Sequence, residues 1–116
     1  MNYEEALALV PTPVKNGWTK EENRVVHYVD GKIYREDGPA IISSDGTQFY
    51  YQNDQLHRLD GPALILQNGH QYYYQNDQLH RNDGPAVIYP NGDKEYWIDG
   101  KQLTEAEFDS RFAGNN

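Results

Sequence analysis

Two His-Arg pairs are the side chains of this sequence best suited to ligand chemistry, and they lie 23 residues apart at His57-Arg58 and His80-Arg81. An imidazole beside a guanidinium can gather a phosphate or a nucleotide. An aspartate follows each arginine by two residues, however, and residues two apart on an extended strand share a face. We therefore favour an ion pair within each unit, and a nucleotide site at these four residues stays open as an alternative.

Metal binding and catalysis are not indicated by the pattern. Equivalent histidines on successive hairpins would lie about 9–10 Å apart, twice the strand spacing. Two such rings cannot share one metal ion that needs bonds of about 2 Å. The sequence also has no cysteine, no glycine-rich phosphate loop and no Gly-x-Ser-x-Gly turn. We expect no metal, no cofactor, no catalytic residue and no enzyme activity.

An internal repeat organises the chain. Asp-Gly-Pro-Ala recurs every 23 residues, at positions 37–40, 60–63 and 83–86. The units run over residues 34–56, 57–79 and 80 to about 102, after half a unit. In each unit a short aliphatic strand follows the proline, a turn rich in Asn, Asp and Gly comes next, and an aromatic strand returns. The pattern predicts one β-hairpin per unit.

The Asp-Gly-Pro-Ala block has a mechanical interpretation. Glycine allows a backbone conformation that other residues avoid, and the following proline fixes φ and removes one N–H donor. We expect Gly38, Gly61 and Gly84 to redirect the chain at the start of each unit in this way.

Short helices are predicted at both ends of a single domain, residues 1–116. Asn2 and Glu5 form a capping box before apolar residues that continue to Val10. Thr104 and Glu107 form a second box before Phe108 and Phe112, and Gly114 is a helix stop. Residues 1–23 are expected to be a helical cap and connector (the connector over 12–23, with Trp18 on the first hairpin), 24–103 the repeats, and 104–116 a capping helix.

The aromatic strands supply the best candidates for partner binding. Tyr50, Tyr73 and Tyr96 occupy one position of the unit, and Tyr51, Tyr74 and Trp97 occupy the next. Neighbours on a strand face opposite ways, so these residues form two rows. Tyrosine and tryptophan dominate binding hot spots, and we expect Tyr50, Tyr73 and Tyr96, with Phe49 and Tyr72, to contact a partner. Cross-strand packing between hairpins is an equal alternative, and which row faces outward stays open.

Charge and composition limit the classes of partner that we expect. The net charge is −8, from 18 acidic and 10 basic residues. Binding to nucleic acid or to anionic lipid needs clustered Lys and Arg, so neither is expected. The sequence shows neither an apolar run long enough to span a membrane nor a secretory signal. We expect a cytoplasmic protein.

The repeats resemble MORN (membrane occupation and recognition nexus) repeats. The closer similarity is to an Asp-Gly-Pro-Ala variant found in bacteriophages, prophages and large viruses, and residues 51–63 carry its motif. The similarity covers residues 24–103. It implies a mostly β fold of tandem 23-residue hairpins in an antiparallel sheet or solenoid, and an origin in a phage or prophage. The usual multiple glycines of MORN repeats are missing, so lipid binding is not carried over.

Together these patterns predict a non-enzymatic binding protein. It would sequester or inhibit a host bacterial protein, of unidentified nature, in the host cytoplasm. One alternative is an acidic nucleic-acid mimic whose Asp37, Asp45, Asp54, Asp60, Asp77, Asp83 and Glu95 line one face unpaired. The other is a sponge for a small nucleotide, which needs an enclosed pocket with Arg58 or Arg81 free of its aspartate.

Overall fold

The computed structural model describes residues 1–9 and 16–113, and it is mostly β with one short helix at each end. The helices are α1 (Tyr3–Ala8) and α2 (Glu105–Ala113). The strands between them are β1 (Gly17–Glu21), β2 (Arg24–Val29), β3 (Lys32–Ile33), β4 (Ile41–Ser43), β5 (Gln48–Phe49), β6 (Tyr51–Gln52), β7 (Gln55–Leu56), β8 (Leu64–Ile65), β9 (Gln71–Tyr72), β10 (Tyr74–Gln75), β11 (Gln78–Leu79), β12 (Val87–Ile88), β13 (Lys94–Ile98) and β14 (Lys101–Leu103). The prediction of antiparallel hairpins between short terminal helices is confirmed.

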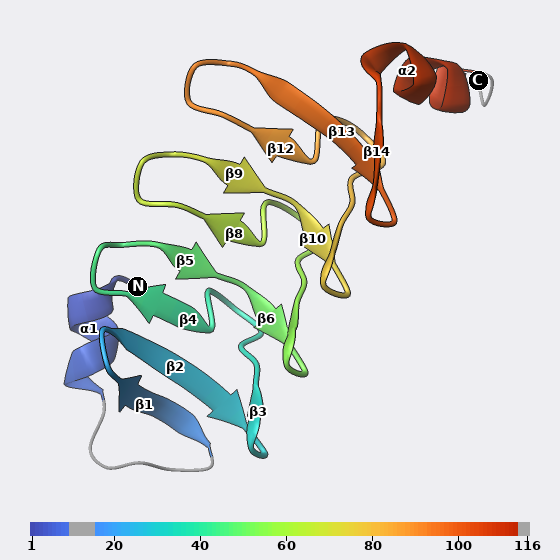
Figure 1. Ribbon diagram of the computed structural model, residues 1–116. Coiled ribbons are helices and arrows are strands. Elements are labelled where there is room, and N and C mark those ends of the chain that lie inside the picture. Colours follow the sequence, from blue (N-terminus) through green and yellow to red (C-terminus); the bar gives the residue numbers. More distant parts are fainter. Residues whose placement is uncertain (10–15, 114–116) are drawn as a thin grey trace.

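Hairpins from successive units lie side by side in one long antiparallel sheet. Its strand order is β1-β2-β4-β5-β8-β9-β12-β13-β14, so each unit adds its hairpin after the previous one. Figure 1 shows the resulting stack, with α1 at one end and α2 at the other. The molecule is elongated, with extents of 52 × 30 × 20 Å.

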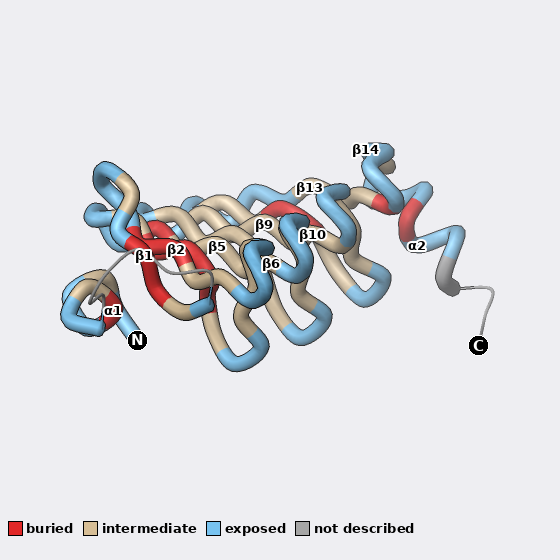
Figure 2. Tube along the Cα trace, turned by 90° about the horizontal axis from the view of Figure 1, so that it is seen from below, coloured by how far each residue is buried: buried red, intermediate tan, exposed pale blue. Residues whose placement is uncertain are grey.

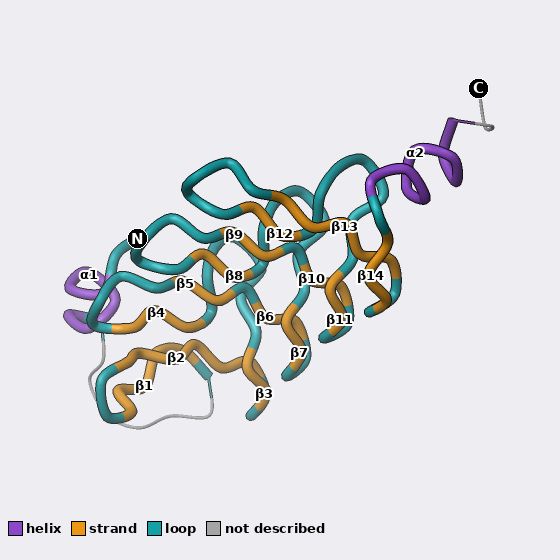
Figure 3. The backbone as a smooth tube through the Cα atoms, turned by 45° about the horizontal axis from the view of Figure 1, so that its top comes forward, coloured by secondary structure: helices purple, strands orange, loops and turns teal. Residues whose placement is uncertain are grey.

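A second, smaller hairpin follows in each unit, so the prediction of one hairpin per unit is incomplete. β6 pairs with β7 and β10 pairs with β11, and both pairs leave the main sheet. Figure 3 shows these small hairpins in a row along one side of the stack. In the last unit one strand serves both hairpins, because β13 pairs with β12 and then with β14.

Main-chain hydrogen bonds recur with the sequence interval of 23 residues. The alanine of each Asp-Gly-Pro-Ala block donates its N–H to the returning strand, from Ala40 to Phe49, from Ala63 to Tyr72 and from Ala86 to Glu95, at 2.8–2.9 Å. The carbonyl of the same alanine accepts an N–H from the preceding unit, as Ala63 does from Tyr50 at 2.7 Å. Backbone bonds therefore fix each block against its own hairpin and against the preceding unit.

The turns of the small hairpins explain a departure from the usual Asn-Gly signal. Asn53 and Asp54 both take positive φ, 49° and 68°, which Asn and Asp tolerate better than most residues. Asp54 Oδ1 accepts the N–H of Ile33 at 2.7 Å, and Asp77 Oδ1 accepts the N–H of Leu56 at 2.6 Å. A glycine would suit the turn but would lack this carboxylate, so aspartate here connects consecutive units.

The amino-terminal helix covers one face of the sheet at its first end. The predicted capping box is present, because the Glu5 N–H bonds Asn2 Oδ1 and the Asn2 N–H bonds Glu5 Oε1. Ala6 is fully buried against Trp18, Val25 and Ile42. Figure 2 shows α1 beneath β1 and β2, where buried residues gather.

The amino-terminal end differs from one expectation and agrees with another. Residues 17–21, expected as part of a connector, form strand β1 instead. They pair antiparallel with residues 24–28 of β2 across a tight turn. The expected packing of Trp18 on the first hairpin is confirmed. Val10 lies outside the described residues.

The carboxy-terminal helix begins at its predicted capping box. The Glu107 N–H donates to Thr104 Oγ1, and the Thr104 N–H donates to Glu107 Oε1. Phe108 is buried, and its ring centroid lies 4.7 Å from that of Tyr96. Gly114 and the side chain of Phe112 lie outside the described residues.

Candidate functional site

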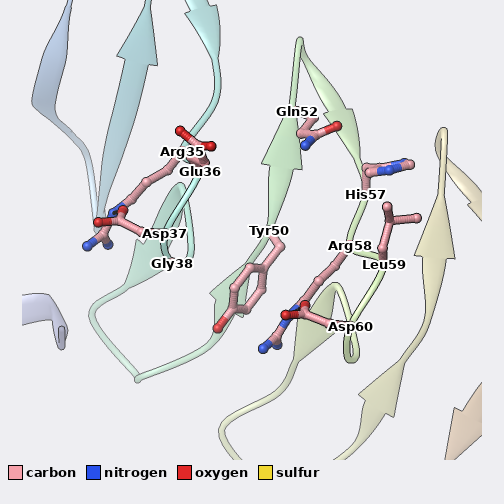
Figure 4. Close-up of a pocket in the computed structure, with 10 residues that line it drawn as sticks. All are labelled: Arg35, Glu36, Asp37, Gly38, Tyr50, Gln52, His57, Arg58, Leu59 and Asp60. Atoms are coloured by element: carbon pink, nitrogen blue, oxygen red, sulfur yellow. Dashed lines mark hydrogen bonds and ion pairs between the residues drawn. The ribbon is translucent and has the colours of Figure 1, made fainter.

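Two equivalent clefts lie between consecutive units. The first has a volume of about 420 Å³ and the second about 380 Å³. Each residue of the first cleft has a counterpart 23 positions later in the second. The first cleft is lined by Arg35, Glu36, Asp37, Gly38, Tyr50, Gln52, His57, Arg58, Leu59 and Asp60. The second is lined, in the same order, by Arg58, Leu59, Asp60, Gly61, Tyr73, Gln75, His80, Arg81, Asn82 and Asp83. Residues 58–60 belong to both clefts and form the wall between them. Figure 4 shows the first cleft.

An arginine anchors each cleft wall. Arg58 Nε donates to Asp60 Oδ1 at 3.1 Å, and its Nη1 donates to the Pro62 carbonyl at 3.1 Å. Its guanidinium carbon lies 3.9 Å from the centre of the Tyr50 ring, a cation–π distance. Figure 4 shows Arg58 alongside this ring. One side chain thereby ties the loop, the proline carbonyl and the aromatic strand together.

The same anchor is built in the other units. Arg81 bonds Asp83 at 2.9 Å and the Pro85 carbonyl at 3.1 Å, and it lies 4.1 Å from the Tyr73 ring centre. Arg35 makes the corresponding bonds to Asp37 and to the Pro39 carbonyl, and it lies 5.1 Å from the centre of the Trp18 ring. The expected Arg-Asp pairing within units is present in all three units.

The glycine of the Asp-Gly-Pro-Ala block is needed for space, so the conformational explanation is wrong. Gly38, Gly61 and Gly84 are absent from the glycines with positive φ. A Cβ on Gly61 would lie 2.8 Å from Arg58 Cζ, and the other two glycines give 3.0 and 2.9 Å to their own arginines. The guanidinium lies against the bare glycine Cα, and any side chain there would displace it.

The charges of these anchors are unequally exposed. The arginine side chains are 14%, 25% and 23% exposed, whereas Asp37, Asp60 and Asp83 are 85%, 88% and 86% exposed. Each guanidinium is already bonded and covered by a ring. A molecule approaching the cleft row therefore meets carboxylates first, and Coulomb attraction favours a cationic group there.

The two candidate histidines line the clefts, but each already uses one ring nitrogen. His57 Nδ1 accepts the N–H of Asn76 at 3.1 Å, and His80 Nδ1 accepts the N–H of Asp99 at 3.0 Å. A neutral imidazole that accepts at Nδ1 carries its proton on Nε2. Both rings thus fix the turn of the following small hairpin and keep one N–H for another acceptor.

The predicted partner-binding row is partly covered. Tyr50 and Tyr73 lie under Arg58 and Arg81, and Tyr96 packs on Phe108. Phe49 lies opposite Ile41 and Leu64 on the neighbouring strands, and Leu64 lies opposite Tyr72. Phe49 and Tyr72 therefore lie on the same face of the sheet as Ile41 and Leu64. All five candidate rings are half-buried. The cleft, rather than an open ladder of rings, is where Tyr50 and Tyr73 present accessible surface.

Glu95 and Asp45, two further residues of the expected acidic face, make bonds within the protein. Glu95 accepts from the Tyr89 hydroxyl at 2.6 Å and from Trp97 Nε1 at 2.9 Å. The bond to Glu95 raises the pKa of Tyr89 to about 12, because the carboxylate stabilises the neutral phenol. The Thr47 N–H bonds Asp45 Oδ1 and holds the pKa of that carboxyl below its usual value. The unpaired acidic face required of a nucleic-acid mimic is not formed by these side chains.

The described part of the chain forms neither a metal-binding cluster nor a membrane-spanning helix. Within residues 1–9 and 16–113, no group of three or more His, Asp or Glu side chains is placed to hold a metal ion. No helix in this part of the chain has the length and apolar character needed to cross a membrane.

Comparison with known proteins gives no relative. No protein-family model, no curated protein and no solved structure matches the chain. The similarity of its units to MORN-like repeats therefore stays an expectation from the residues themselves.

Sequence reasoning missed the clefts as sites and missed Gln52 and Gln75 within them. Their facing walls come from equivalent positions of consecutive units, 23 residues apart, as Asp37 and Asp60 illustrate. The 23-residue interval was the signal that could have predicted a row of sites, because a cleft formed between one pair of units recurs between the next pair.

Proposed function

We propose that this protein is a non-catalytic binding module whose row of inter-unit clefts grips a basic segment of another protein. The observation that carries the proposal is the exposure of one carboxylate per unit beside an arginine that is already satisfied. Repeated at a fixed interval, this arrangement presents the same tyrosine-lined cleft, with exposed carboxylates on its walls, more than once.

Rigidity favours tight recognition by such a surface. Each cleft wall is held by an ion pair, a bond to a carbonyl and a ring contact, as Arg58 shows. Side chains that are fixed before binding lose little conformational entropy when a partner arrives. The net charge of −8 also attracts basic partners over long distances.

The resemblance to phage and prophage repeats supplies the rest of the proposal. Tandem units stacked as a MORN-like solenoid would serve as a platform, and its partner would be a bacterial host protein that is sequestered or inhibited. The nucleotide sponge gains no support from the geometry, because Arg58 and Arg81 are both paired with their aspartates.

Capture from bacterial lysate with two matched variants tests this function. The cleft variant carries Asp37→Asn, Asp60→Asn and Asp83→Asn, and the control carries Glu4→Gln, Glu22→Gln and Asp109→Asn. Both lose three negative charges, but the control residues are exposed and lie outside the cleft linings. We expect the control to retain a captured host protein that the cleft variant loses.

Asparagine can still accept the arginine Nε–H, so the cleft variant should keep its fold, which circular dichroism checks. Equal capture by both variants, or no protein captured by the unaltered chain, would show that the clefts do not serve this function.

A further inference from the structure

We propose that the clefts bind a polyproline II segment that carries a basic residue at every third position. This inference rests on the proposed function and names the conformation and sequence pattern of the partner. It follows from the spacing of the clefts, the groups that line them and the charge at their rim.

The spacing of the clefts comes from the sheet. Successive units place equivalent strands two positions apart in the order β4-β5-β8-β9-β12-β13. Neighbouring strands lie about 4.7–4.9 Å apart, so equivalent points on consecutive units are about 9–10 Å apart. The two clefts share the wall at residues 58–60, so they are direct neighbours in this row.

A polyproline II helix matches this interval with side chains on one side. It has three residues per turn and rises about 3.1 Å per residue, so residues i and i+3 lie about 9.3 Å apart and point the same way. An extended β-strand rises about 3.3 Å per residue and alternates its faces. Its same-side residues are about 6.6 or 13.2 Å apart, and neither distance fits.

An α-helix is the nearest competitor. Residues i and i+7 lie about 10.5 Å apart on nearly the same side, since the rise is 1.5 Å per residue. A helix with side chains is about 10–12 Å wide, however, and its main-chain groups are bonded internally. It would offer no main-chain acceptors to the polar side chains that line the clefts.

Those polar groups suit a polyproline II backbone. The side chains of Gln52 and Gln75 line the clefts and make no hydrogen bond with the described residues, and His57 has a free Nε2–H. The polyproline II backbone has no internal hydrogen bonds, so its carbonyls are free to accept from these donors. The glutamines and histidines would donate hydrogen bonds to the main-chain carbonyls of the segment in both clefts.

Aromatic and apolar groups fit the remaining residues of such a segment. Tyr50 and Tyr73 each line one cleft, and grooves lined by aromatic rings are a recurring surface for proline-rich segments. Leu59 projects from the shared wall with 75% exposure. Asp60, 88% exposed on the same wall, lies within reach of a cation in either cleft.

Fluorescence anisotropy with short peptides tests the spacing. The probes are (Lys-Pro)3, (Lys-Pro-Pro)3 and (Lys-Pro-Pro-Pro)3, which have equal charge and differ in the interval between lysines and, with it, in length. Only the three-residue interval lets two lysines enter both clefts at once. Because the second contact is then intramolecular, we expect (Lys-Pro-Pro)3 to bind at least about tenfold more tightly than the other two.

Three further arms complete the experiment. (Glu-Pro-Pro)3 should not bind, and an alanine-rich helical peptide with lysines seven residues apart should bind more weakly than (Lys-Pro-Pro)3. Asp60→Asn should weaken binding of (Lys-Pro-Pro)3 more than Asp109→Asn, which removes the same charge on α2 outside both clefts.

Equal affinity for the three intervals, tighter binding of the helical peptide, or no binding of any probe would overturn the inference. In each of these cases lysate capture that still depends on Asp37, Asp60 and Asp83 would leave the proposed function standing. Loss of that dependence would remove both.

Discussion

Replacing Ile42 by alanine should lower the free energy of unfolding by about 3 kcal/mol, within the range for large-to-small changes in a packed core. Ile42 is 1% exposed and lies on strand β4 on the face that packs against helix α1, in contact with Ala6, Trp18 and Val25. Removing three carbon atoms there leaves a cavity that the helix and sheet cannot close. Urea denaturation, read by circular dichroism, measures the loss.

The repeat supplies the matched control. Ile65 holds the same position in the next unit and the same face of the sheet, because both residues pair with Gln48. It is only half-buried, since α1 packs on β1, β2 and β4. Ile65→Ala should therefore cost about 1 kcal/mol. Equal losses at the two positions would mean that α1 does not cover Ile42 in solution.

Gly61→Ala should destabilise the protein by about 2 kcal/mol, although Gly61 does not have positive φ. The new Cβ would displace the Arg58 guanidinium from Asp60, from the Pro62 carbonyl and from the Tyr50 ring. In an Arg58→Ala background the same change should cost about nothing, because the space is then empty. Four denaturation curves give this double-mutant cycle.

The cycle separates the two explanations of the glycine. If the backbone needed glycine for its conformation, Gly61→Ala would be equally harmful with and without Arg58. A coupling energy near zero would therefore contradict the steric account.

The hairpins and the caps were predictable because they depend on local chemistry. Asn68-Gly69 and Asn91-Gly92 are turn signals with glycine at φ 97° and 94°. Both helices begin at capping boxes that are recognisable from the residue types and their three-residue spacing. The Arg-Asp pairs followed from two-residue spacing. In each case the interacting groups are close along the chain, so spacing alone places them.

Features that depend on tertiary contacts were not predictable. The role of Gly61 depends on where the Arg58 side chain lies, and the conformational propensity of glycine does not indicate that position. Tyr50 and Tyr96 have identical positions in their units, yet an arginine covers one and Phe108 contacts the other. The chain also bends between β5 and β6, which directs the small hairpin out of the sheet and forms one side of the cleft.

An NMR titration with (Lys-Pro-Pro)3 tests most directly whether the cleft row is the binding surface. Backbone amide shifts should move together at residues 35–38, 58–61 and 80–83, which form the walls of both clefts. They should saturate at one peptide concentration, because a single segment would occupy the two clefts at once. Shifts confined to α1 and the strands beneath it, or no shifts at saturating peptide, would contradict the account.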